Sequence, residues 1–180
     1  ATARPFSAAL MVERIASAEQ LLKSGHLTVT LDYGDGNQSL ADMRFDFGTS
    51  EQPARYRIVS TYGLGSSAQT VERIIIDDRS WQRQAGGGWV EQPAQDSVGE
   101  QIRSYLPRAA EVANPSATRE GNDAILRWYD VGRDVDATLV VDPATGIPRE
   151  LRQQGRNNRT SVTVIYESWN ADIAITPPVQ

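Results

Sequence analysis

The sequence contains no cysteine and only one histidine, His26. The absence of cysteine excludes disulfide bonds, zinc–thiolate sites and thiol catalysis. His26 has neither a cysteine nor a second histidine with which to build a metal site or a catalytic triad, so we interpret it as a surface or boundary residue. No nucleophile, base and orienting group can be assembled from the remaining residues. We therefore expect no metal, no cofactor and no enzymatic activity.

Positive charge is also scarce. The 180 residues carry 17 Arg and one Lys against 23 acidic residues, for a net charge of −5, and no run of basic residues occurs. Nucleic-acid binding needs clustered positive charge, so we expect no nucleic-acid partner. No apolar run approaches the roughly 20 residues that a membrane-spanning helix requires. The chain starts at Ala1 rather than Met, and we expect Ala1–Pro5 to be a leader left over from a linker to a signal or anchor.

The segment after this leader has helical composition. Between Phe6 and Ser24, apolar residues recur at steps of three and four, which predicts an amphipathic helix over residues 6–24. The stripe consists of Ala8, Met11, Ile15, Ala18 and Leu22. Gly25 follows directly, and we expect it to end the helix in the left-handed conformation.

From residue 26 to residue 92 the hydrophobic period changes to two. Leu27, Val29 and Leu31 alternate with polar residues, as in a half-buried strand. Turn signals then separate further strands, and Gly86-Gly87-Gly88 predicts a hairpin. This part of the chain is therefore expected to consist of antiparallel strands.

A short second helix is predicted from Asp96 to Leu106. Asp96 is a suitable N-cap, Val98 and Ile102 lie on one face, and Pro107 limits continuation. We expect this helix to act as a lid near the open side of the sheet. The following segment, Ala109 to Gly121, is rich in Ala, Asn, Pro and Ser and is interpreted as a linker.

Strands are predicted again from residue 122 to residue 176. The turn Asp142-Pro143-Ala144-Thr145-Gly146 joins two of them, because proline fixes φ and glycine tolerates positive φ. Ser161–Trp169 alternates as a strand, and Ala171–Thr176 is predicted as a last strand that Pro177-Pro178 ends. The whole chain, residues 1–180, is thus expected to be a single α+β domain in which a curved antiparallel sheet of ten or eleven strands wraps over the first helix and the short second helix.

The order of these elements resembles a known family. The letters that support the resemblance are D-P-A-T-G-I-P-R-E-L-R, V-T-V-I-Y-E-S-W-N and I-T-P-P within residues 142–178, and more weakly residues 77–89. They are similar to the LolA-like superfamily of bacterial lipoprotein carriers and its LppX/LprG-type lipoprotein relatives. The resemblance implies an incomplete β-barrel over helices, export from the cytoplasm, and acyl chains held between sheet and helices. It also implies a periplasmic or extracellular location close to a membrane, in which case any lipid-anchoring cysteine would precede Ala1.

Large side chains are expected on the face of the sheet that meets the first helix. They are Leu31, Tyr33, Phe45, Phe47, Tyr56, Ile58, Tyr62, Tyr129 and Tyr166. We interpret the space between sheet and helices as an apolar site for a lipid or acyl chain; the alternative is a solid core. The predicted lining residues are Met11, Ile15, Leu31, Phe45, Phe47, Tyr56, Ile58, Tyr62, Ile75, Val98 and Ile102.

A second hypothesis keeps the fold but not the lipid. Regulators of envelope-stress sigma-factor pathways resemble this superfamily, so the alternative function is an envelope sensing or protein-interaction module that binds a membrane-anchored protein. A co-purifying lipid would favour the carrier, and a dry core with a large exposed apolar patch would favour the interaction module.

Overall fold

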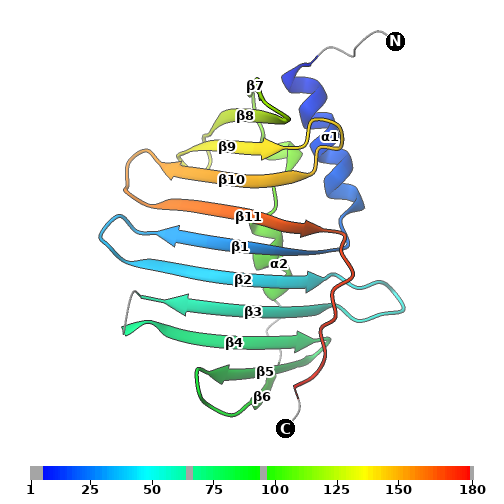
Figure 1. Cartoon of the computed structure of the whole chain (residues 1–180), viewed down its shortest axis with the longest axis vertical. Coiled ribbons are helices and arrows are strands. Elements are labelled where there is room, and N and C mark those ends of the chain that lie inside the picture. The colour runs from blue at the N-terminus through cyan, green and yellow to red at the C-terminus, as the bar shows by residue number, and fades with distance from the viewer. Residues whose placement is uncertain (1–5, 64–66, 94–96, 179–180) are drawn as a thin grey trace.

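A computed structural model describes residues 6–63, 67–93 and 97–178. These residues form one antiparallel sheet of 11 strands in the order β6-β5-β4-β3-β2-β1-β11-β10-β9-β8-β7, and the edge strands β6 and β7 do not meet (Figure 1). The strands are β1 (Ser24–Asp32), β2 (Gln38–Asp46), β3 (Arg55–Tyr62), β4 (Gln69–Ile76), β5 (Arg79–Gln84), β6 (Val90–Pro93), β7 (Ser116–Glu120), β8 (Asp123–Asp130), β9 (Val135–Val141), β10 (Pro148–Gly155) and β11 (Ser161–Trp169). The predicted curved, incomplete barrel is confirmed.

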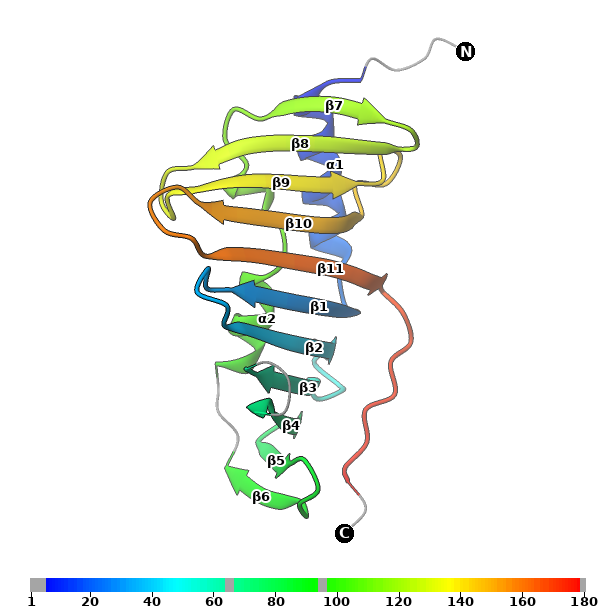
Figure 2. The ribbon, with the colours of Figure 1, turned by 60° about the vertical axis from the view of Figure 1, so that its left-hand side comes forward.

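Both helices lie on the same side of the sheet, which we call the inner face (Figures 1 and 2). The buried residues of the core cluster come from the helices and from the inner face. They are Met11, Ile15, Leu27, Val29, Met43, Phe45, Ile58, Ile75, Val98, Ile102, Leu106, Val112, Ala124, Leu126, Leu139, Val141, Leu151, Val164 and Tyr166. In the described part of the chain, no helix is long and apolar enough to cross a membrane.

The first helix, α1, runs over Ala8–Leu21 and is shorter than predicted. Ser7 is its N-cap, because the Ser7 hydroxyl accepts a hydrogen bond from the Leu10 N–H at 3.2 Å. The prediction that Gly25 ends the helix was wrong: the helix is followed by extended backbone at Leu22, and Gly25 lies within β1. A Cβ on Gly25 would lie 2.8 Å from Cζ of Phe45, so glycine is needed there for the close approach of a ring from β2.

The second helix, α2, runs over Val98–Ser104, within the predicted residues 96–106. Its predicted N-cap, Asp96, lies outside the described residues. The predicted linker was wrong in part. It contains the 3-10 turn η2 (Ala109–Glu111) and the edge strand β7. All five residues of β7 are at least partly exposed, so no apolar alternation marks the strand in the sequence.

The predicted last strand, Ala171–Thr176, was also wrong. The described residues that follow β11 form no strand and instead run along the ends of the strands toward β5 (Figure 1). The reason is topological: β11 already pairs with β1 on one side and with β10 on the other, so no position beside it is free. Ile175 packs against Ile74 and Trp81, which face away from the helices, on the face that we call the outer face.

The turn between β9 and β10 forms as predicted and fixes α1. The Asp142 carboxylate accepts hydrogen bonds from the N–H groups of Ala144 and Thr145, and Gly146 has φ +75°. A Cβ on Gly146 would lie 2.3 Å from the backbone carbonyl carbon of Arg14. The turn therefore packs directly on the helix backbone, which only glycine permits.

Candidate functional site

The structure brings most of the predicted lining residues together between the helices and the inner face of the sheet. Seven of them belong to the buried core cluster: Met11, Ile15, Phe45, Ile58, Ile75, Val98 and Ile102. Leu31, Phe47 and Tyr56 are partly buried against that cluster. Tyr62 is 55% exposed at the end of β3. We therefore place it at the rim.

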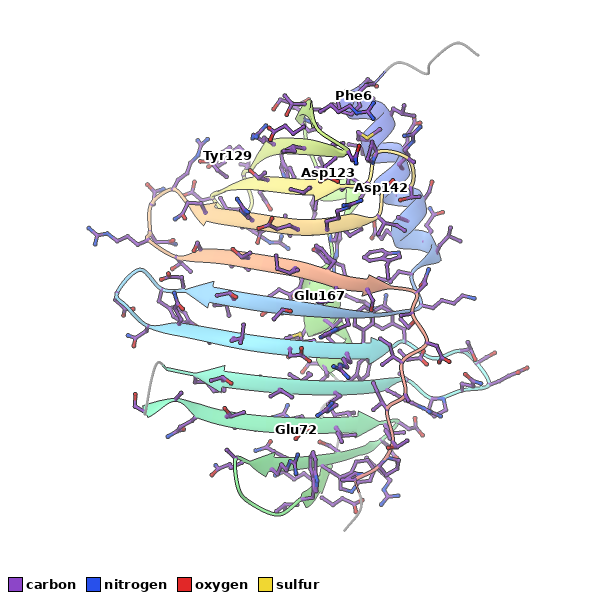
Figure 3. The ribbon with its side chains drawn as sticks, viewed as in Figure 1. Phe6, Glu72, Asp123, Tyr129, Asp142 and Glu167 are labelled. Carbon is purple, nitrogen blue, oxygen red and sulfur yellow. The ribbon has the colours of Figure 1, made fainter. Side chains whose placement is uncertain are left out.

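Tyr129 was wrongly expected on the inner face. Its neighbour Trp128 packs on the core cluster, and Tyr129 points the other way, where its hydroxyl donates to the Asp134 carboxylate at 2.5 Å. The Arg156 guanidinium lies 3.9 Å from the Tyr129 ring centroid. Figure 3 labels Tyr129 near the end of β8. This side chain belongs to a polar cluster on the outer face.

Helix α2 is pressed closely onto the sheet. Val98 and Ile102 are its buried residues, and they pack in the core cluster that also contains Ile58 and Ile75. A Cβ on Gly99 would lie 2.8 Å from the Tyr56 hydroxyl oxygen. The glycine thus lets the helix backbone approach the ring of Tyr56.

Two contacts hold the C-terminal end of α2. The buried Tyr166 hydroxyl donates a hydrogen bond to the Tyr105 carbonyl oxygen at 2.6 Å, and burial raises the pKa of Tyr166 well above its usual value. The Arg103 guanidinium lies 3.8 Å from the ring centroid of Phe47. Burial also raises the pKa of Tyr56, an effect that the positive charge of Arg103 opposes. A helix of seven residues is not stable by itself, so these contacts and the buried Val98 and Ile102 determine its position.

A first recess, which we call the sheet recess, opens beside α2 and has a volume of about 290 Å³. It is lined by Ile58, Ser60, Tyr62, Val71, Arg73, Gln82 and Gln101. Ile58 also belongs to the core cluster, so the recess reaches the apolar interior. Arg73 donates a hydrogen bond to the Gln82 side-chain oxygen at 3.1 Å.

Sequence reasoning identified Ile58 and Tyr62 but missed the polar lining residues. Ser60 lies two positions from each of them in β3, and Arg73 lies two positions from Ile75 in β4. The two-residue period of a strand therefore places these polar side chains on the inner face.

A second recess, which we call the inter-helix recess, lies on the other side of α2 and also measures about 290 Å³. It is lined by Glu19, Leu22, Arg103, Leu106 and Arg108. Gln101 lines the sheet recess and Arg103 the inter-helix recess, as expected for residues about 200° apart around a helix. Helix α2 thus separates two openings on the same inner face.

The outer face carries ion pairs. Nε2 of His26 and Oδ2 of Asp42 lie 2.6 Å apart, on strands β1 and β2. Glu72, labelled on β4 in Figure 3, accepts hydrogen bonds from Arg57 and Arg83, both at 2.8 Å. Among the residues that the structure describes, no three His, Cys, Asp or Glu side chains are grouped to hold a metal ion.

The chain resembles known proteins in structure and not in sequence. No protein-family model matches the sequence, and a search of curated proteins finds no match. Among solved structures, LprF from Mycobacterium bovis superposes with a TM-score of 0.68 at 11% identity, over 98% of this chain and 100% of LprF. The chain therefore has the same fold as LprF.

Two further solved structures are similar. MucB superposes with a TM-score of 0.53 at 16% identity, over 94% of this chain and 60% of MucB. NE2245 from Nitrosomonas europaea, a LolA superfamily protein, covers 94% of this chain and 96% of its own at 10% identity, with a TM-score of 0.34. The predicted curved, incomplete barrel over two helices is therefore a fold that the chain shares with LprF and MucB.

Proposed function

We propose that this chain is a binding protein of the bacterial cell envelope, working outside the cytoplasm, that holds an apolar chain between α2 and the inner face of the sheet. The observation that carries the proposal is the sheet recess, which opens to solvent at Tyr62 and reaches the core cluster at Ile58. The LolA-like fold supports an envelope protein of the carrier type, and no catalytic group is part of the proposal.

The volume of the sheet recess limits what it holds without rearrangement. About 290 Å³ lies at the lower end of the range for small-molecule sites, roughly 300–1,000 Å³. A longer chain would enter by displacing α2, which would open the space between Ile102 and Ile75. Burial of each methylene stabilises the complex by about 0.8 kcal/mol, so in this proposal about ten buried methylenes offset the free-energy cost of displacing a short helix.

The rim of the recess is suited to a polar end group. Tyr62 is exposed there, and Arg73, Gln82 and Gln101 supply hydrogen-bonding groups. In this proposal the apolar part of the ligand lies toward Ile58, and uncharged polar groups of the ligand lie at the rim beside Tyr62.

The proposal is tested by filling the recess. Ser60 and Val59 are adjacent in β3, both half-buried, and point to opposite faces. We expect Ser60→Phe to abolish or strongly weaken binding of the neutral fluorophore N-phenylnaphthylamine, whereas Val59→Phe, a matched control on the outer face, should bind it like the wild type. Absence of binding by the wild type, or equal binding by both variants, would refute the proposal.

A second candidate function is binding of a protein partner through the outer face. The observation in its favour is that this face already holds an extended segment, since Ile175 and Ile173 pack against Ile74, Trp81 and Trp89. If this part of the outer face accepts peptides, a chain shortened after Asn170 should bind a synthetic peptide of residues 171–178 and melt at a higher temperature in its presence. A shortened chain whose melting temperature does not respond to the peptide would eliminate this candidate.

A further inference from the structure

The inter-helix recess joins an apolar floor to two positive charges. Leu22, at the end of α1, and Leu106, after α2, supply the apolar surface. Arg103 and Arg108 are both exposed on its wall, and among the described residues Glu19 is the one acidic residue that lines it. The charges that face this recess therefore sum to about +1.

The carboxylates nearby are already engaged. Glu19 accepts a hydrogen bond from the Ala109 N–H at 3.2 Å. Glu111 approaches Arg108 at 3.7 Å, beyond hydrogen-bonding distance, and accepts instead from Arg133 at 3.1 Å. Asp46, whose charge like that of Arg103 acts on Tyr56, accepts a hydrogen bond from the Gly48 N–H at 2.9 Å. Within residues 6–63, 67–93 and 97–178, Arg103 forms no ion pair with a carboxylate and contacts the Phe47 ring instead.

The stacking of Arg103 orients its donors. A guanidinium 3.8 Å from the Phe47 ring centroid is held by the ring face, while its N–H groups remain at the edge of the plane. Such a planar fork matches the two oxygens of a carboxylate or phosphate. The Phe47 ring therefore orients the Arg103 guanidinium but leaves its N–H groups free to donate to an oxyanion.

We propose that the inter-helix recess binds the oxyanion of an anionic amphiphile, a carboxylate or a phosphate ester, through Arg103 and Arg108. The first methylenes of the amphiphile lie against Leu22 and Leu106. This assignment rests on the proposed function, because the rest of the apolar chain continues from this recess beneath α2. Beyond the proposed function, the assignment specifies that the ligand is an anion and that its charged group binds in the inter-helix recess.

The test compares an acid with its neutral ester. Isothermal titration calorimetry is carried out with decanoate, methyl decanoate and inorganic phosphate on the wild type, on Arg103→Gln/Arg108→Gln and on Arg44→Gln. Arg44 is a control of the same residue type on the outer face of β2, with its closest carboxylate contact at 3.9 Å, and Arg44→Gln removes one positive charge, as Arg108→Gln does. Because both arginines are exposed, we expect the wild type to bind decanoate on the order of tenfold more tightly than methyl decanoate at low salt. The double variant should lose this preference, and Arg44→Gln should keep it.

Each outcome distinguishes this proposal from the proposed function. Binding of the ester and the acid with equal affinity by the wild type, or an unchanged preference in the double variant, overturns the oxyanion site and leaves the apolar site standing. Absence of binding by either ligand overturns both. If inorganic phosphate binds as tightly as decanoate, and this binding depends on the two arginines, the proposal that the ligand is an amphiphile is wrong and the recess is a site for free anions. If the double variant does not fold, Arg108→Gln, which leaves the stacked Arg103 intact, should still reduce the preference about threefold.

Discussion

Removal of one hydroxyl should loosen helix α2 without disturbing the sheet. In Tyr166→Phe the Tyr105 carbonyl loses its donor at 2.6 Å, in a place where Tyr166 is only 9% exposed and water does not easily replace it. An unsatisfied buried carbonyl costs about 1–2 kcal/mol. If α2 opens as a local unit, this cost raises the population of its open state by about 5–30-fold.

Hydrogen exchange measured by mass spectrometry tests this directly. Amides of residues 98–105 should exchange about 5–30-fold faster in Tyr166→Phe, while amides of β9 and β10 should keep their protection. Tyr129→Phe is the matched control, because its hydroxyl donates to Asp134 on the outer face. Unchanged exchange of α2 in Tyr166→Phe, or equal acceleration in both variants, would refute the view that this hydrogen bond holds the helix.

Two further predictions concern the outer face. Burial raises the pKa of Glu72, but hydrogen bonds from Arg83 and Arg57 outweigh it and leave the pKa below its usual value. Ionised Glu72 therefore stabilises the fold above the ordinary glutamate pKa of about 4.3, and this contribution is lost as pH falls through the lowered pKa. In urea unfolding, Glu72→Gln should be less stable than the wild type by about 1–3 kcal/mol at pH 7, and the difference should be smaller below about pH 4. An equal difference in stability at both pH values would contradict this prediction. Ile175→Ala should lower the free energy of unfolding by about 2–4 kcal/mol, because Ile175 is only 3% exposed and packs against Ile74 and Trp81. Ile173 is only partly buried, so Ile173→Ala should lower the free energy of unfolding by less. Equal effects of the two substitutions would argue against the observed position of the residues that follow β11.

Sequence patterns predicted the elements of the fold that depend on residues close together in the chain. The stripe of α1, the two-residue period of the strands and the turn at Asp142–Gly146 each depend on residues close in sequence, and each is confirmed. Gly25 was misinterpreted because its role is a contact with Phe45, which comes from another strand. Ile173 and Ile175 are in phase, as a strand over Ala171–Thr176 requires, but they pack on the outer face rather than beside a neighbouring strand.

The candidate site was predictable only in its apolar part. Ile58 and Ile102 were identified because apolar residues at regular spacing indicate a core. Gln101 and Arg103 carry no such signal, since a polar residue on a short helix is usually in solvent. Their place beside the two recesses depends on where α2 lies over the sheet, and that is set by Tyr166, Phe47 and Gly99, far apart in the sequence.

The central claim is that an apolar chain lies between α2 and the inner face of the sheet. Native mass spectrometry of the wild type, mixed with methyl decanoate in the absence of detergent, tests it most directly because the ligand has no charge and its mass is known. The account predicts one bound ligand per chain in the wild type, together with slower hydrogen exchange in residues 98–104 of α2 when the ligand is bound. A spectrum with no adduct, or an adduct that leaves the exchange of α2 unchanged, would contradict it.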